Sequence, residues 1–308
     1  MKAKVSIIGA GNVGATTAHL ILQSGIADVV LYDIAEGIPQ GKALDLSEAA
    51  PLWNVSALSK GTNSYADTAG SDIVVITAGF PRKPGMSRDD LLHANAAVIR
   101  TASAEIAKTS QDAIVIVVTN PMDVMSQVAW KTTEFSCRRV MGMGGILDSA
   151  RFRTFISVEL GVSPEDIEAL VLGGHGDQMV PLPRLTTVKG ISITEILKRK
   201  TIELLIQRTR NGGAEIVSLL KSGSAYYAPA AAVFQMVKAI LLDEKRMLPC
   251  AVYLNGEYGI KDIYVGVPVV LGKDGVEKII EVKLSKEEKA QFRKSCASVR
   301  KLIKKLSI

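Results

Sequence analysis

The sequence predicts an α/β protein in which a doubly wound parallel sheet is followed by an α+β domain. In the first half of the chain, short runs rich in Val and Ile alternate with longer segments of helical periodicity. The runs are apolar on both faces, which is typical of strands buried between two layers of helices. Past a glycine-rich stretch near residue 145, the helical segments become longer and strand-like segments follow them. We therefore predict two domains, residues 1–145 and residues 146–308.

The individual elements follow from the same periodicities. In the first domain we predict strands at 5–8, 29–32, 73–76 and 114–118, with helices at 13–23 and 89–108. In the second we predict helices at 146–160 and 202–220 and strands at 263–270 and 276–282.

Composition excludes several classes of protein. Of the 308 residues, 47% are hydrophobic and 22% are charged, so we expect a packed core rather than disorder. No apolar run approaches the roughly 20 residues of a membrane span, and the chain enters its first strand without a signal peptide. We expect a cytoplasmic protein that has no membrane partner.

The net charge and the cysteines bear on three further classes: nucleic-acid-binding proteins, disulfide-stabilised proteins and metal-binding proteins. The net charge of +6 invites a nucleic-acid hypothesis, in which affinity would fall steeply with salt. However, many of the lysines lie near the C-terminus, between apolar residues of helical spacing: Phe292, Cys296, Val299, Ile303 and Leu306. That pattern is typical of the solvated face of an amphipathic helix, so we expect no nucleic-acid partner. The three cysteines lack Cys-x-x-Cys spacing, so neither a disulfide framework nor a metal site is predicted.

A glycine-rich loop follows the first predicted strand. Its six residues fit the pattern Gly-x-Gly-x-x-Gly: Gly9, Ala10, Gly11, Asn12, Val13 and Gly14. The first glycine permits a tight turn, the second lets the backbone approach a pyrophosphate, and the third lets helix and strand pack closely. The phosphates then meet the N-terminus of the helix. An ordinary glycine-rich turn is the alternative.

Asp33 strengthens the nucleotide hypothesis, because it stands at the end of the next strand, about 20 residues after the loop. A carboxylate there can accept hydrogen bonds from an adenosine ribose and would repel a 2′-phosphate. The sequence therefore favours NAD over NADP and a Rossmann-type first domain. Asp33 as a mere loop cap remains the alternative.

Two further strands end in residues that we expect at the same crevice, because ligands bind at the carboxyl ends of parallel strands. These residues are Thr77, Ala78 and Gly79 after one strand, and Val118, Thr119 and Asn120 after the other.

His175 is the candidate acid–base residue. Of the three histidines, His19 and His93 lie in predicted helices, whereas His175 is flanked by glycines that leave room for another molecule to approach its ring. Histidine exchanges protons near neutral pH most effectively when a carboxylate orients the ring. Asp148 is the candidate orienting residue, and it shares a helical face with Arg151. A local ion pair between Asp148 and Arg151 without chemistry is the alternative.

A loop at residues 79–88 carries three cations, and its prolines and glycines suggest a stiffened flap with hinges. Taken alone, the loop favours the alternative that its cations point at solvent. On helical spacing, Arg88 and Asn95 share one face and could both turn towards the crevice.

Together these residues resemble the malate dehydrogenases of the lactate dehydrogenase-like superfamily. The resemblance covers nearly the whole chain; it is weakest over residues 51–60, and its main stretches are 76–92, 119–123, 146–153, 172–181, 208–229 and 264–272. It implies a homodimer or homotetramer in which residues 1–145 bind NAD and residues 146–308 bind the substrate and carry the catalytic histidine.

The resemblance also implies residue roles. Asp148 and His175 form the proton-relay pair, Arg151 binds the carboxylate beside the reacting carbon, and Arg88 closes over the substrate and polarises its carbonyl. Asn120 contacts both the nicotinamide region and the substrate hydroxyl, Asn95 contacts the cofactor, and Ser224 lies near the substrate pocket. The reaction implied is the interconversion of (S)-malate and oxaloacetate, with His175 as the proton acceptor.

Within this resemblance, Arg82 indicates which substrate is used, because lactate dehydrogenases usually carry Gln at this position and malate dehydrogenases carry Arg. A desolvated arginine without a partner is costly, so a substrate that lacks the second carboxylate is penalised. The alternatives are a lactate or other 2-hydroxyacid dehydrogenase, and a non-catalytic NAD-binding regulatory module, which the presence of both His175 and Asp148 disfavours.

Substituting Arg82→Gln is expected to move the preference from oxaloacetate towards pyruvate by orders of magnitude in kcat/KM, because Gln cannot pair with a second carboxylate. Steady-state rates with the two substrates and NADH measure the shift. An unchanged ratio of the two kcat/KM values would show that Arg82 does not select the substrate.

Overall fold

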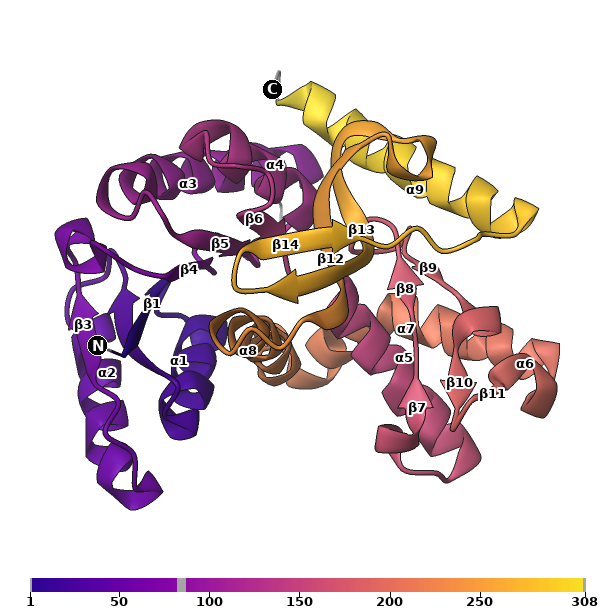
Figure 1. Ribbon diagram of the computed structural model, residues 1–308, viewed down its shortest axis with the longest axis horizontal. Helices are drawn as coiled ribbons and strands as arrows, with labels where there is room; N and C mark the ends of the chain where they lie inside the picture. Colours follow the sequence, from indigo (N-terminus) through magenta and orange to yellow (C-terminus); the bar gives the residue numbers. More distant parts are fainter. Residues whose placement is uncertain (1, 82–86, 307–308) are drawn as a thin grey trace.

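The computed structural model describes residues 2–81 and 87–306 (Figure 1). Nine strands of these residues form one sheet: β1 (Ala3–Ile8), β2 (Ala27–Tyr32), β3 (Ser59–Thr62), β4 (Ile73–Ile76), β5 (Ile114–Val117), β6 (Val140–Gly142), β12 (Arg246–Asn255), β13 (Lys261–Gly272) and β14 (Gly275–Ile279). Their order across the sheet is β14-β13-β12-β6-β5-β4-β1-β2-β3.

The first six strands are parallel and follow the order of a Rossmann fold, 3-2-1-4-5-6. The order reverses between β1 and β4, which is where such sheets open a crevice at their carboxyl ends. The predicted doubly wound parallel sheet is thus confirmed. The second half of the chain extends the same sheet, since β12 pairs antiparallel with β6 and is followed by the antiparallel β13 and β14.

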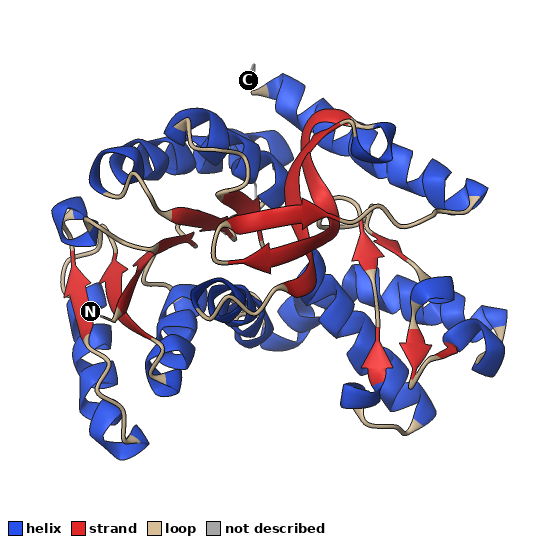
Figure 2. Cartoon of the chain, in the orientation of Figure 1, coloured by secondary structure: helices blue, strands red, loops and turns tan. Residues whose placement is uncertain are grey.

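Helices cover both faces of the sheet (Figure 2). They are α1 (Asn12–Ser24), α2 (Ile38–Ala49), α3 (Arg88–Thr109), α4 (Met122–Thr133), α5 (Gly145–Leu160), α6 (Ile193–Ile196), α7 (Arg199–Leu220), α8 (Tyr227–Leu241) and α9 (Lys286–Lys305). Helices α3 and α4 pack together on one face, and α1 packs on α8 on the other (Figure 1). A helix from the second half therefore helps to bury the sheet of the first.

The amphipathic C-terminal helix is confirmed. Helix α9 begins with a capping box, in which Ser285 and Glu288 satisfy each other's backbone N–H groups. It buries Phe292, Cys296 and Val299 while its lysines remain exposed.

One predicted strand, 276–282, extends too far. Strand β14 ends at Ile279, and beyond it the Tyr258 hydroxyl donates to the Ile280 carbonyl at 2.8 Å and accepts from the Val282 N–H at 3.0 Å. A side chain thus takes the backbone groups that a longer strand would have paired.

Two hydrophobic cores hold the chain. The larger one runs from Val5 to Leu306 and includes strands from both halves. The smaller one lies around α5 and α7, with the short strands β7 (Ile167–Glu168), β8 (Val171–Leu172), β9 (Val180–Pro181), β10 (Thr187–Val188) and β11 (Ile191–Ser192) close by. The division into domains at residues 145 and 146 stays a prediction, since the sheet and the larger core continue across it.

Phe152 in α5 is fully buried in the smaller core, so Phe152→Ala is expected to lower the free energy of unfolding by about 3–5 kcal/mol. Val158, on the same helix but 70% exposed, is the matched control, and Val158→Ala is expected to change stability by less than about 0.5 kcal/mol. Denaturant unfolding of both variants measures this. Equal decreases in the free energy of unfolding of the two variants would contradict a second core centred on Phe152.

Candidate active site

His175 lies on a loop after β8, and glycines with positive φ shape this loop. Gly173 and Gly176 have φ of 86° and 141°, values that a residue with a Cβ rarely adopts. The imidazole is largely buried, with 14% of the side chain exposed. The glycines therefore allow the turn that carries the ring inward.

Asp148, in the first turn of α5, holds the ring. Its Oδ2 lies 2.8 Å from His175 Nδ1. An ionised carboxylate can only accept a hydrogen bond, so Nδ1 carries the proton and Nε2 is left to exchange one. Burial alone would lower the pKa of His175, but the charge and hydrogen bond of Asp148, with a further contribution from Asp123, raise that pKa above its ordinary value.

Arg151 lies one helical turn after Asp148. Its Nη1 is 3.6 Å from Asp148 Oδ1, which makes an ion pair but not a hydrogen bond. Its buried Nε has no hydrogen-bond partner within the part of the chain that the structure describes. Burial lowers the pKa of the guanidinium, against the charge of Asp148. The side chain fits against Gly212 of α7, where an added Cβ would come within 3.1 Å of Arg151 Cδ. A buried guanidinium with unused donors is suited to bind a carboxylate.

Two residues that the sequence analysis did not single out hold the backbone of the catalytic loop. Asp123 Oδ2, at the start of α4, accepts the His175 N–H at 2.8 Å, and Ser295 Oγ, in α9, accepts the Gly174 N–H at 2.8 Å. Asp123 follows a strand end, which was a usable signal. Ser295 lies in the middle of a helix, and nothing in its sequence context marks it.

A cavity of about 650 Å³ adjoins this loop, and its lining includes His175, Asn120 and Asp123. Asn120 is exposed, and its carbonyl accepts a hydrogen bond from Asn95 Nδ2 at 2.7 Å. Asn120 thus lies beside the candidate catalytic histidine, at the carboxyl end of β5.

Asn95 turns its amide towards the loops that border the crevice. It is 1% exposed, its Oδ1 accepts the Phe80 N–H at 2.7 Å, and its Nδ2 donates to the carbonyls of Asn120 and Phe80. Its amide therefore ties two crevice loops together, and a direct contact of Asn95 with the cofactor stays a prediction.

The glycine loop has the close contacts that its motif predicts. Gly9 has φ of 112°, and a Cβ on Gly14 would come within 1.9 Å of the Gly9 carbonyl oxygen. At Gly11 an added Cβ would meet nothing within 4 Å. The first and third glycines are thus required by the fold, while the second faces open space.

Asp33 is both a loop cap and a crevice residue. Its Oδ2 accepts the Ala10 N–H at 2.7 Å, and its Oδ1 accepts the Ala35 N–H at 3.0 Å. Each carboxylate oxygen keeps a further lone pair, so a ribose hydroxyl can still donate to it.

The other strand-end residues lie around the same loops. Thr77 Oγ1 donates to the Gly9 carbonyl at 3.0 Å, and Thr119 Oγ1 donates to the Ala78 carbonyl at 2.7 Å. Gly79 faces Thr119 so closely that an added Cβ would lie 2.5 Å from its Cγ2, and Val118 is 9% exposed. These contacts join the ends of β1, β4 and β5.

Three predicted substrate residues are not joined to this cluster by the described contacts. Arg82 lies outside the described residues, and Arg88 begins α3 but its side chain is not described. Ser224 is exposed in the turn between α7 and α8.

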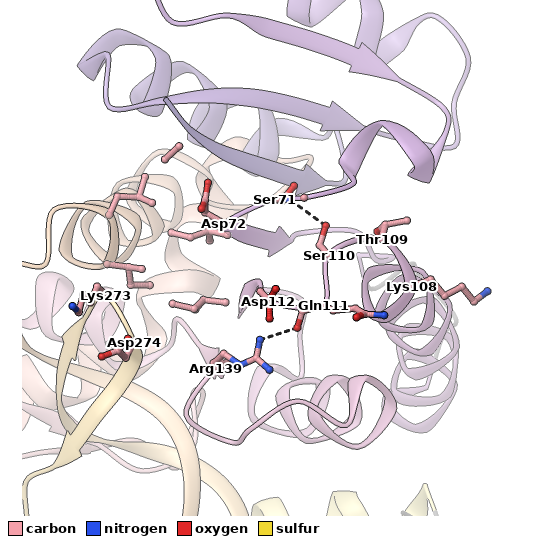
Figure 3. A pocket seen from close by; sticks show the side chains of 16 residues that line it. Ser71, Asp72, Lys108, Thr109, Ser110, Gln111, Asp112, Arg139, Lys273 and Asp274 are labelled. Atoms are coloured by element: carbon pink, nitrogen blue, oxygen red, sulfur yellow. Dashed lines mark hydrogen bonds between the residues drawn. The ribbon is translucent and has the colours of Figure 1, made fainter. Parts of the chain in front are cut away.

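A larger cavity, of about 860 Å³, lies elsewhere (Figure 3). It is lined by the first residues of β1, β4 and β5, so it is at the amino ends of the strands, opposite the crevice. Within it, Arg139 donates to the Gln111 carbonyl at 2.8 Å, and the Ser71 N–H donates to Ser110 Oγ at 3.3 Å (Figure 3). Its position and its lining separate it from His175.

Across residues 2–81 and 87–306, no helix has the length and apolar character needed to cross a membrane. The same residues contain no group of three or more His, Cys, Asp or Glu side chains arranged to hold a metal ion.

Comparison with known proteins identifies the family. A model of the lactate/malate dehydrogenase NAD binding domain matches residues 3–142, and one of the lactate/malate dehydrogenase alpha/beta C-terminal domain matches residues 146–307. The chain belongs to the lactate/malate dehydrogenase family.

Relatives within the family span the whole chain. A protein of Desulforudis audaxviator named malate dehydrogenase is 58% identical over 305 residues, which cover 99% of each chain. The crystal structure of Cryptosporidium parvum malate dehydrogenase is 45% identical, with a TM-score of 0.97, covering 100% of this chain and 99% of that one. A lactate dehydrogenase of the same organism, complexed with lactic acid and nicotinamide adenine dinucleotide, is 40% identical with a TM-score of 0.97, covering 100% and 98%.

Two alanine substitutions test the glycine loop of this family member. Gly14→Ala is expected to lower the thermal midpoint by several degrees, because its Cβ would overlap the Gly9 carbonyl. Gly11→Ala is expected to keep the midpoint but to weaken NADH binding at least about tenfold, because its Cβ faces the space that a pyrophosphate would need. Thermal unfolding and NADH fluorescence titration separate the two effects; unchanged NADH affinity in Gly11→Ala would contradict this placement.

Proposed function

We propose that this chain is an NAD-dependent malate dehydrogenase that interconverts (S)-malate and oxaloacetate. The observation that carries the proposal is the buried pair of His175 and Asp148, at 2.8 Å, one helical turn from the buried guanidinium of Arg151. A proton-exchanging nitrogen and a carboxylate-binding fork in one site suit a 2-hydroxy acid. The 58% identity to a protein named malate dehydrogenase supports the choice of substrate.

The crevice fits NAD. Helix α1 begins at the glycine loop without a side-chain cap and without an acidic residue in its first turn, so its first N–H groups are open to a pyrophosphate. Gly11 leaves the space for that approach. Asp33 suits a ribose hydroxyl and disfavours a 2′-phosphate. The residues that would hold the cofactor are Gly9 to Gly14, Asp33, Thr77 to Gly79 and Val118 to Asn120.

Bound NADH supplies the hydride for reduction of oxaloacetate, and NAD accepts it in the reverse reaction. Arg151 binds the carboxylate beside the reacting carbon, and Arg88 polarises the carbonyl. Protonated His175 donates its Nε2 proton to the carbonyl oxygen, giving the hydroxyl of malate. In the oxidation of malate, neutral His175 accepts the hydroxyl proton at Nε2, and Asp148 stabilises the resulting imidazolium.

A lactate dehydrogenase is the second candidate, favoured by the fold similarity to the lactate dehydrogenase of Cryptosporidium parvum at a TM-score of 0.97. The two activities share His175, Asp148 and Arg151 in this proposal, so the fold does not discriminate between them. Arg82 is the residue that discriminates between the two substrates, because it pairs with the second carboxylate of oxaloacetate.

The proposal has three further parts. They are assembly as a homodimer or homotetramer, cytoplasmic location and a substrate contact by Ser224.

His175→Ala is expected to lower kcat for oxaloacetate reduction by about 10²–10⁴-fold, because the proton donor is lost. NADH affinity is expected to persist, since the ring serves the chemistry more than the cofactor site. The assay follows NADH absorbance with oxaloacetate, and fluorescence titration gives NADH binding.

The exposed His93 on α3 provides the matched control, and His93→Ala is expected to retain full turnover. Near-normal kcat in His175→Ala would rule out its role. Absence of oxaloacetate-dependent NADH oxidation by the unmodified protein would rule out the proposed function itself.

A further inference from the structure

Three successive backbone N–H groups of the catalytic loop are held by three different elements. Gly173 N–H donates to the Gly266 carbonyl of β13 at 2.9 Å. Gly174 N–H donates to Ser295 Oγ of α9, and His175 N–H donates to Asp123 Oδ2 of α4, both at 2.8 Å. The position of the imidazole therefore depends on the fold around the loop as well as on Asp148.

The third of these acceptors, the carboxylate of Asp123, is energetically unfavourable to bury. It is 4% exposed, and its buried Oδ1 finds no hydrogen-bond partner among residues 2–81 and 87–306. Burying a carboxylate with incomplete hydrogen bonding is unfavourable. A neutral hydroxyl suffices at the neighbouring N–H, as Ser295 demonstrates. Positioning alone therefore does not account for a charged group at Asp123.

The charge has an effect on the ring that a hydroxyl lacks. Asp123 acts with Asp148 to raise the pKa of His175, against burial and the positive charge of Arg151. Conversely, burial raises the pKa of Asp123 to about 6, while the charge and the N–H of His175 oppose this rise. The carboxylate form of Asp123 therefore adds a second negative charge that favours the imidazolium.

Other ionisable groups surround the pair from each packed element. Burial raises the pKa of the Cys296 thiol of α9; the charge of Asp123 adds to this rise, and the charge of Arg300 of the same helix opposes it. The cavity beside His175 is further lined by Asp89 of α3, Asp177 of the loop, and Lys301 and Lys305 of α9. None of these groups receives the His175 N–H, which distinguishes Asp123 from them.

We propose that Asp123 is a second carboxylate of the proton relay, which positions His175 through its backbone N–H and stabilises the imidazolium by its charge. This inference rests on the proposed function and deepens it. Asp123 touches neither substrate nor cofactor in this account and acts only through His175.

The negative charge of Asp123 fixes the direction in which its removal shifts the pH profile. Reduction of oxaloacetate needs protonated His175, so kcat/KM falls as the pH rises through the pKa of His175. Removing the negative charge of Asp123 lowers that pKa, and the alkaline limb of the profile then moves to lower pH.

The experiment compares Asp123→Asn with Ser295→Ala. The asparagine carbonyl can still accept the His175 N–H but carries no charge, whereas Ser295→Ala removes a neutral acceptor from the neighbouring N–H. We expect Asp123→Asn to shift the alkaline limb of kcat/KM for oxaloacetate, with NADH, to lower pH by about half a unit or more. Ser295→Ala is expected to lower the rate by a similar factor at every pH and to leave the limb in place. NADH affinity serves as the folding control for both.

An unshifted limb in Asp123→Asn, or an equal shift in Ser295→Ala, would overturn the inference. If Asp123→Asn does not fold, Asp123→Ser keeps a small neutral acceptor and is expected to produce the same shift. An NMR titration of the His175 imidazole in the same variants, without substrate, gives the pKa directly. That readout is independent of turnover, so a failure of the proposed function and a failure of this inference remain distinguishable.

Discussion

The hydrogen bond between Asp148 and His175 is the interaction on which the site depends. It places the proton on Nδ1, leaves Nε2 for proton exchange, and sets the negative charge that stabilises an imidazolium in a largely buried position. Asp148 also pairs with Arg151 at 3.6 Å, so one carboxylate contacts both the proposed proton-exchanging ring and the guanidinium proposed to bind the substrate. A buried carboxylate is tolerated here because it accepts a hydrogen bond from His175 and pairs with the cationic guanidinium of Arg151.

The fold brings this pair to the crevice by joining the two halves of the chain. The reversal of strand order between β1 and β4 opens the cofactor crevice, and β12 extends the same sheet so that the second half continues from its edge. The loop of His175 is then held by α4 from the first half and by β13 and α9 from the second. The proposed acid–base residue therefore lies where elements of the two halves of the chain meet.

Much of this could be predicted from the sequence, where local pattern and local structure coincide. The strand at 73–76 and the glycine loop are continuous motifs whose geometry depends on neighbouring residues. The sequence analysis did not predict α8 or the pairing of β12 with β6, because their place depends on contacts between distant segments. The contacts of Asp123 and Ser295 could not be predicted for the same reason, since each accepts a backbone N–H from a residue at least 52 positions away. Only the position of Asp123 after a strand end gave a signal. Asn95 was expected to turn towards the crevice, and its amide joins two loops that border it.

The most direct test of the central claim is the pH dependence of kcat/KM for oxaloacetate reduction by the unmodified protein, followed through NADH absorbance. Because the charge of Asp148 raises the pKa of His175, the account predicts an alkaline limb with an apparent pKa above the ordinary value of a histidine side chain. A profile that is flat on the alkaline side, or whose limb lies below the ordinary pKa of a histidine side chain, would contradict the assignment of His175 and Asp148 as the proton relay.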